Sequence, residues 1–291
     1  MCDDSDFDRM TDYFRRMQLS RRQFGALSVG AALGSVVPAI ADARELQVSE
    51  VDIPTPDGTC DAYFAHPAKG TWPAVLVWPD IMGLRPAFKQ MAQRLAQSGF
   101  AVLVVNPFYR MRRAPTSPEH PDLDDPATRA AVMGMAAGLS AQTAATDANA
   151  LVPWLDNQVA VNKQRMMASA GYCFGGPYTL RTAAAFPDRV GAIASFHGAP
   201  MVTDKVDSAH LLIQKINVHA LIAIAESDDK QEPGVKTVLR ETFDRAHLPA
   251  EIEVYAGALH GWCPPDSRAY NHEQAEKAWA RQLAVFKQGL A

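Results

Sequence analysis

One short segment constrains this chain more than any other: Gly171-Tyr172-Cys173-Phe174-Gly175-Gly176. It follows residues 165–170, which have the length and composition of a buried strand, and it precedes a helical pattern that ends at Phe186. Glycines two residues before and two residues after a central residue permit a turn that is too tight for side chains at those positions. The segment therefore predicts that Cys173 lies on a sharp turn between a strand and a helix.

From about Arg44 onward, apolar runs of strand length alternate with longer helical patterns. A hairpin comes first, with strands over 46–53 and 60–66 and a turn at Asp57-Gly58. The other expected strands are 74–78, 100–105, 165–170, 190–196, 220–225 and 251–255, and the other expected helices are 86–98, 127–157, 234–246 and 272–290. Residues 106–126 contain several prolines and acids and are expected to form a loop. This alternation predicts an α/β fold with a mainly parallel sheet of about eight strands and helices on both faces.

A glycine-flanked nucleophile between a strand and a helix is typical of the α/β-hydrolase fold. There the backbone N–H of the following residue, here Phe174, points at the developing oxyanion. The start of the next helix favours a thiolate at Cys173. The acid and the histidine come later, each at the carboxyl end of a later strand. Asp228 and His260 follow two such predicted strands, so Cys173, Asp228 and His260 occur in the required order.

Each of these roles has an alternative. His260 would take the thiol proton or hold the thiolate in an ion pair, and Asp228 would fix its tautomer. Asp229 is the rival for the orienting acid. His197 is a rival base because it also follows a predicted strand, but it precedes the acid in the chain and is interpreted as a pocket wall. The alternative for Cys173 is a structural cysteine in a tight turn.

Charge and cysteine content exclude other classes. The 291 residues have a formal net charge of -4 with no long run of one sign, whereas nucleic-acid binding needs clustered Lys and Arg. The four cysteines have no CxxC spacing and are too few for a disulfide scaffold. No two histidines have metal-ligand spacing on a convincing helix. We therefore expect no metal, no cofactor and no nucleic-acid partner.

Residues 1–43 are predicted to be an export signal and residues 44–291 a single folded domain. Ser20-Arg21-Arg22-Gln23-Phe24 precedes an uncharged segment, 25–41, that is too short and too rich in Gly and Ala for a membrane span. Ala41-Asp42-Ala43 is a plausible cleavage site. Paired arginines at this place resemble a twin-arginine (Tat) signal, which is an address and not an anchor. The resemblance implies Tat export machinery as a partner, a periplasmic or secreted location and no stable membrane anchor. A chance arginine pair on an amphipathic helix is the alternative.

With Gly-Tyr-Cys-Phe-Gly-Gly, the later acid and Leu259-His260-Gly261 in place, the sequence resembles the dienelactone hydrolase family from about Gln47 to the C-terminal helix. Family members are single-domain α/β-hydrolases that open unsaturated lactones with a Cys-His-Asp triad. The resemblance assigns that triad to Cys173, His260 and Asp228.

A second match to the family is Pro79-Asp80-Ile81-Met82-Gly83-Leu84. The resemblance implies that the Asp80 carboxylate, in place of the family's usual glutamate, accepts the cysteine proton in the resting enzyme. It also implies that the backbone N–H of Ile81 is the second oxyanion donor. A turn-forming acid is the alternative role for Asp80.

The substrate-binding residues depart from the family. Its best-known members hold the substrate carboxylate with arginines, one of them four residues after the catalytic histidine, where this chain has Pro264. Proline cannot replace a bidentate guanidinium. Candidate replacements and pocket-wall residues are Arg129, Arg268, Tyr172, His197 and Trp262, with core packing as the alternative for Tyr172 and Trp262.

The sequence therefore predicts a hydrolase of small esters or lactones that acts through a thioacyl-enzyme and has a small-molecule substrate as its main partner. A broad-specificity carboxylesterase for neutral esters is an alternative. An exported redox-active thiol protein is another, and it needs Cys60 or Cys263 close to Cys173. A binding protein with an inactive site is disfavoured because all three catalytic residue types occur in the required order.

Overall fold

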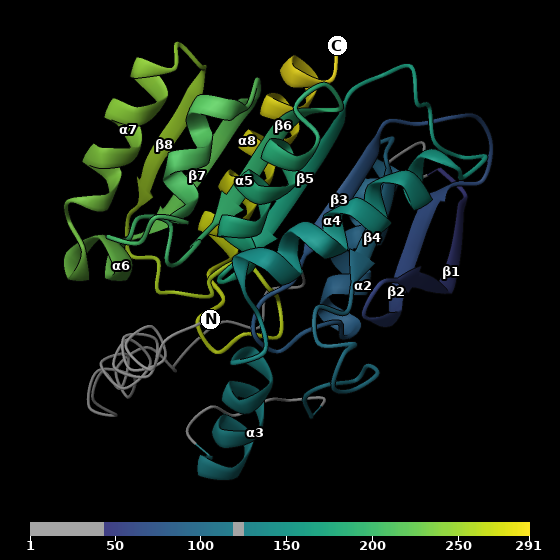
Figure 1. Ribbon diagram of the computed structural model, residues 1–291, viewed down its shortest axis with the longest axis horizontal. Coiled ribbons are helices and arrows are strands. Elements are labelled where there is room, and N and C mark those ends of the chain that lie inside the picture. The colour runs from purple at the N-terminus through teal and green to yellow at the C-terminus, as the bar shows by residue number, and fades with distance from the viewer. Residues whose placement is uncertain (1–43, 119–124) are drawn as a thin grey trace, which may run out of the picture. The chain divides into compact units, whose positions relative to one another are not determined.

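Eight strands form one sheet in the order β1-β2-β4-β3-β5-β6-β7-β8 (Figure 1). The computed structural model describes residues 44–118 and 125–291, which belong to one unit of the chain. β1 (Leu46–Thr55) and β2 (Gly58–Pro67) form the predicted antiparallel hairpin, and β2 is also antiparallel to β4. The other neighbouring strands pair in parallel. The predicted mainly parallel α/β sheet is confirmed.

The central strands are short, and each consists mainly of apolar residues. They are β3 (Ala74–Trp78), β4 (Ala101–Val105), β5 (Met167–Tyr172), β6 (Val190–Phe196) and β7 (His219–Ala225), and β8 (Ala250–Tyr255) forms the edge. All side chains of β3 to β6 are buried. A parallel strand covered on both faces needs apolar residues at successive positions, and these sequences have them.

Helices cover both faces of the sheet (Figure 1). α2 (Pro86–Gln97) and α8 (His272–Gly289) pack on one face, and α4 (Ala141–Asp156) and α5 (Gly175–Ala185) on the other. The remaining helices are α3 (Pro126–Ala136), the 3-10 helix η2 (Ala209–Lys215), α6 (Glu226–Gln231) and α7 (Val235–Arg245). None of the helices in the described ranges combines the length and the apolar composition that a membrane crossing needs.

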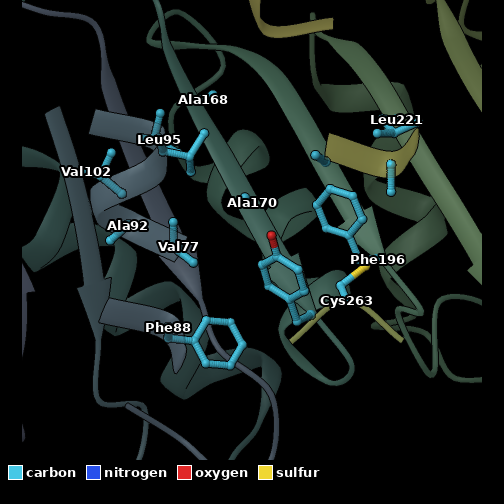
Figure 2. Packing of buried hydrophobic residues seen from close by; sticks show 14 of the residues in the cluster. Val77, Phe88, Ala92, Leu95, Val102, Ala168, Ala170, Phe196, Leu221 and Cys263 are labelled. Carbon is cyan, nitrogen blue, oxygen red and sulfur yellow. The ribbon is translucent and has the colours of Figure 1, made fainter. Parts of the chain in front are cut away.

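The core under α2 and α8 positions the loops at the carboxyl edge of the sheet. Figure 2 shows Val77, Ala170 and Phe196, from three neighbouring strands, in one cluster with Phe88 and Leu95 of α2. Phe88 is 0% and Leu95 2% exposed. Burial of each side chain contributes roughly 1.5–3 kcal/mol, which holds α2 and the loop before it against the sheet.

One helical prediction was wrong, and one short α-helix was not predicted. The helix expected over 127–157 is interrupted, because Ser140 starts a new helix with a capping box. The Ser140 hydroxyl accepts a bond from the Thr143 N–H at 3.1 Å, and the Thr143 hydroxyl accepts one from the Ser140 N–H at 2.8 Å. The short helix α6 was not predicted, because its sequence is polar throughout and has no apolar periodicity.

Glycines close the turn between β5 and α5. A Cβ added to Gly171 would overlap the carbonyl oxygen of Gly175. A Cβ added to Gly175 would lie 2.5 Å from the carbonyl oxygen of Trp78, on the neighbouring strand β3. Both obstacles are backbone atoms, which cannot rotate away as a side chain can. The backbone of this turn therefore approaches its neighbours too closely for any side chain.

We predict that Gly171→Ala lowers the free energy of unfolding by roughly 2–3 kcal/mol, because the methyl group forces the backbone of the turn to move. Gly134→Ala is the control: no heavy atom lies within 4 Å of a Cβ at this position of α3. It should raise stability by about 0.5–1 kcal/mol, since alanine loses less backbone entropy in a helix. Urea unfolding followed by circular dichroism measures the stability of both variants. A Gly171→Ala variant that unfolds at the same urea concentration as wild type would contradict the prediction.

Candidate active site

Cys173 lies on the turn between β5 and α5 with a φ of 55°. Few residues other than glycine adopt this conformation, and they are concentrated at functional sites. Its backbone N–H donates to the carbonyl oxygen of Phe196 and to Nδ1 of His197, both at 3.1 Å. These bonds fix the strained turn to the end of β6. Cys173 is buried but keeps a small exposed fraction of 5%.

Two backbone N–H groups at this edge of the sheet have no acceptor within residues 44–118 and 125–291. They belong to Phe174, which directly follows Cys173, and to Ile81, which follows β3. Ile81 lies in a turn that is closed by a bond from the Gly83 N–H to the Asp80 carbonyl at 2.8 Å. A pair of uncommitted N–H donors is the group that an oxyanion hole requires.

Asp228 and His260 lie together at the carboxyl ends of β7 and β8. Nδ1 of His260 is 2.9 Å from Oδ2 of Asp228, which lies on α6. The backbone N–H of His260 donates to the hydroxyl of Ser227 at 2.9 Å, so the histidine loop is held by the same helix. Asp229 forms an ion pair with Lys236 at 2.6 Å instead. Of the two candidate acids, the structure places Asp228 against the histidine.

Charge and hydrogen bonding favour the protonated form of His260. Burial lowers the pKa of this histidine, but Asp228 and Cys173 raise it to about 10, each by its charge and by a hydrogen bond. His260 thus interacts with the carboxylate through one side and with the thiol through the other. The arrangement can hold an imidazolium between a carboxylate and a thiolate.

His197 packs against the rings of His260 and Trp262. Its ring centroid lies 4.7 Å from that of His260 and 5.1 Å from that of Trp262, and it is 1% exposed. Burial lowers the pKa of His197 well below its usual value, and the neighbouring His260 lowers it further. The neutral His197 ring accepts the Cys173 N–H at Nδ1 and so supports the backbone of the turn. We therefore do not assign the base role to His197.

Asp80 lies in a buried cluster with an arginine that the sequence analysis did not single out. Both oxygens of Asp80 accept bonds from Arg85, at 2.6 and 2.9 Å, and Oδ1 also accepts one from the Met82 N–H at 2.9 Å. Arg85 donates in addition to both oxygens of Asp266, at 2.6 and 3.0 Å. Burial lowers the pKa of Arg85, but the two carboxylates raise it by more than burial lowers it. The pKa therefore lies above its usual value, and the guanidinium stays charged. That Asp80 accepts the proton of Cys173 stays a prediction.

A family model for the dienelactone hydrolase family matches residues 60–290, from β2 to the end of α8. The chain belongs to the dienelactone hydrolase family. It is therefore a hydrolase in a family that acts on lactones and esters. The match spans β3, the turn at Cys173 and the loops with Asp228 and His260.

Relatives match over most of their length. A protein named as a probable 2-oxo-3-(5-oxofuran-2-ylidene)propanoate lactonase from Bradyrhizobium sp. is 26% identical over 81% of this chain and 92% of its own. A provisionally named carboxymethylenebutenolidase from Methylorubrum extorquens is 27% identical over 93% of each chain. A provisionally named dienelactone hydrolase from Klebsiella pneumoniae has a similar structure, with a TM-score of 0.73, 23% identity, and coverage of 84% of this chain and 100% of that one. This last likeness confirms the fold.

The residues suggested for substrate binding are scattered in this member of the family. Tyr172 is in the core, stacked on Phe196 with ring centroids 4.8 Å apart. Trp262 is fully buried against Tyr255 and His197. Arg129 is half-buried on α3, and Arg268 is exposed in the loop between β8 and α8. Their part in substrate binding stays a prediction.

The cysteines and the other potential ligand groups are also placed. Cys60, Cys173 and Cys263 are all buried free thiols. Burial raises the pKa of Cys60 and of Cys263 above the usual thiol value, and charges of Asp147 and Asp61 add to this at Cys60. Neither thiol is therefore a ready nucleophile. In the part of the chain that the structure describes, no three His, Cys, Asp or Glu side chains are grouped as metal ligands.

Sequence reasoning missed three residues that hold the site: Ser227, Arg85 and Asp266. Ser227 carries the only hydroxyl in a run of acids, which is a weak signal. Arg85 stands between Leu84 and Pro86 at the start of a helix, where an isolated charge among apolar residues could have indicated a buried ion pair. Asp266 had no signal in its own surroundings.

We predict that Asp228→Asn destabilises the protein by roughly 1.5–3 kcal/mol near pH 6 and by much less near pH 10. The folded-state pKa of His260 lies above its usual 6.5, so protonated His260 contributes its full stability below about pH 6.5. That contribution is lost as the pH rises toward 10, and with it the difference between wild type and variant. Chemical unfolding at pH 6, 8 and 10 measures the trend.

Asp229→Asn is the matched control, because it removes the neighbouring carboxylate without touching His260. It should show no such dependence on pH. If both variants lose stability in parallel at every pH, the coupling of Asp228 to His260 is wrong.

Proposed function

We propose that this protein cleaves a small carboxylic ester or lactone through a Cys173–His260–Asp228 triad and a thioacyl-enzyme. The observation on which the proposal depends is that His260, bonded to Asp228 at 2.9 Å, also interacts with Cys173, which together with Asp228 raises its pKa. The two uncommitted N–H groups of Phe174 and Ile81 support it, because they supply donors for the oxyanion.

In the first half of the reaction the Cys173 thiolate attacks the carbonyl carbon, and the carbonyl oxygen takes the negative charge. The N–H groups of Ile81 and Phe174 stabilise this charge. The tetrahedral intermediate collapses to a thioester, and the departing alkoxide takes a proton from the His260 imidazolium. In a lactone the alkoxide stays attached to the acyl group as a hydroxyl or enol.

In the second half His260, now neutral, takes a proton from water, and the resulting hydroxide attacks the thioester. Collapse of this intermediate releases the carboxylic acid and restores the thiolate beside the imidazolium. Asp228 keeps Nδ1 of His260 protonated, so the other ring nitrogen is the one that exchanges protons with the substrate.

We predict that Cys173→Ala lowers kcat for p-nitrophenyl acetate by about 10³-fold or more, because removing the nucleophile of a triad leaves only binding and oxyanion stabilisation. Cys60→Ala is the control: its thiol is buried and bonded to the Asn106 carbonyl, and activity should be retained. A dienelactone is assayed beside the ester. A Cys173→Ala variant as active as wild type would overturn the proposal.

One observation favours a second candidate, a broad carboxylesterase for neutral esters. Pro264 occupies the position of a family arginine, and the buried Arg85 is already neutralised by Asp80 and Asp266. A guanidinium bound to two carboxylates does not attract a third. Cleavage of p-nitrophenyl acetate without turnover of the anionic dienelactone would select this candidate.

We also propose that residues 1–43 direct the protein through the Tat machinery to the periplasm or outside the cell. Arg21 and Arg22, the apolar segment after them and Ala41-Asp42-Ala43 support this proposal. These positions lie outside the described residues.

Replacement of Arg21 and Arg22 by lysine is expected to move the protein from the periplasmic to the cytoplasmic fraction, since the Tat receptor recognises the arginine pair itself. Arg15→Lys with Arg16→Lys is the control and should leave export unchanged. Immunoblots of cell fractions from a bacterium with an active Tat system measure the result. Equal export of both double variants would contradict the proposal.

A further inference from the structure

We propose that Arg85 is a positioning residue that ties the loop of Ile81 to the loop after His260 and so holds the oxyanion donor in place relative to the base. The inference rests on the proposed function, because it assigns a role within the same site. Neither the family match nor the sequence pattern assigns Arg85 a role.

Every N–H of the Arg85 guanidinium is engaged. Nη1 and Nη2 each donate to one oxygen of Asp80, Nε and Nη2 donate to the two oxygens of Asp266, and Nη1 also reaches the Gly83 carbonyl at 3.3 Å. A guanidinium has five N–H groups in a rigid plane, so these bonds use its full capacity. Arg85 is 3% exposed.

The Asp80 side of this cluster fixes the peptide that supplies the oxyanion donor. Asp80 directly precedes Ile81, and its Oδ1 accepts the N–H of Met82, the residue after Ile81, at 2.9 Å. The carboxylate thus restrains the chain on both sides of Ile81 while Arg85 restrains the carboxylate. The direction of the Ile81 N–H is therefore set by a side chain four residues away in the sequence.

The Asp266 side connects the same guanidinium to a distant part of the chain. Asp266 lies in the loop that begins after β8 and contains His260. Its bonds to Arg85, at 2.6 and 3.0 Å, join residues that are 181 positions apart in the sequence. Loops from β3 and β8, which are not neighbours in the sheet, are held to each other at this point.

A third contact places the guanidinium against the core. The Arg85 guanidinium carbon lies over the Phe88 ring at 4.9 Å, and Phe88 packs edge-on against Tyr172 at 5.2 Å. Tyr172 directly precedes Cys173. The Arg85 side chain is therefore in contact with the segments that hold the oxyanion donor and the base, and indirectly with the one that holds the nucleophile.

The test separates the oxyanion hole from the thiolate. Hydrolysis of p-nitrophenyl acetate needs both, whereas alkylation of Cys173 by iodoacetamide needs the thiolate and develops no oxyanion. Arg85→Lys keeps the charge but cannot form the planar set of bonds. It should lower kcat by about 10- to 100-fold with little change in KM, as expected for a misplaced donor. Alkylation should proceed at a rate close to that of wild type.

Asp266→Asn is the second variant, because it leaves the Asp80–Arg85 pair intact and weakens only the link to the histidine loop. It decides the question if Arg85→Lys fails to fold. We expect kcat to fall less than in Arg85→Lys, again without loss of alkylation. Arg94→Met is the control from α2, the helix that Arg85 precedes: its pair with Glu276 is on the surface, at 2.5 Å and about two-fifths exposed, and activity should not change.

Wild-type kcat in folded variants of both Arg85 and Asp266 would overturn the inference. So would an equal loss of hydrolysis and alkylation, which would place the effect on the thiolate or on folding. The proposed function fails in a different way. It would be wrong if Cys173→Ala were active or if the wild-type protein did not hydrolyse the ester, and neither result depends on Arg85.

Discussion

The backbone of β5 meets the first turn of α5 at a distance that only glycine permits, and the geometry of the site depends on this contact. Gly171 lies against the Gly175 carbonyl, and Gly175 lies against the carbonyl of Trp78 in β3. The chain between them must turn through a positive φ at Cys173. This turn places the cysteine at the carboxyl edge of the sheet and leaves the N–H of Phe174 outside the helix ladder.

A second constraint is the cost of burying charge beside an apolar core. Arg85, Asp80 and His260 are each less than 10% exposed, and Asp80 and Arg85 follow β3, which contains no charged residue. Each charge has an opposite partner: Arg85 with Asp80 and Asp266, and His260 with Asp228. Removing one partner would leave an uncompensated charge, so these pairs fix the loops in one arrangement.

Local sequence predicted the strands and the nucleophile well. β3 was predicted at its observed bounds because a strand buried on both faces is a short apolar run between breakers. The helix over 127–157 was predicted as one element because alanine-rich sequence is helical throughout, while the break depends on hydrogen bonds at Ser140. Helix α6 was not predicted, and for that reason the sequence could not decide whether Asp228 or Asp229 orients His260. Adjacent residues on a helix point in directions about 100° apart, so only one of them can face His260.

The alternation of strands and helices, the glycine-flanked turn and the candidate nucleophile Cys173 can be read from the sequence alone, because these features depend on residues close together in the chain. The bond from Asp228 to His260, and the bonds by which Arg85 joins Asp80 to Asp266, depend instead on the three-dimensional arrangement of the loops. Such pairs lie up to 181 positions apart. Their partners are chosen by which loops the parallel sheet brings to one edge, and no local pattern of residues encodes that choice.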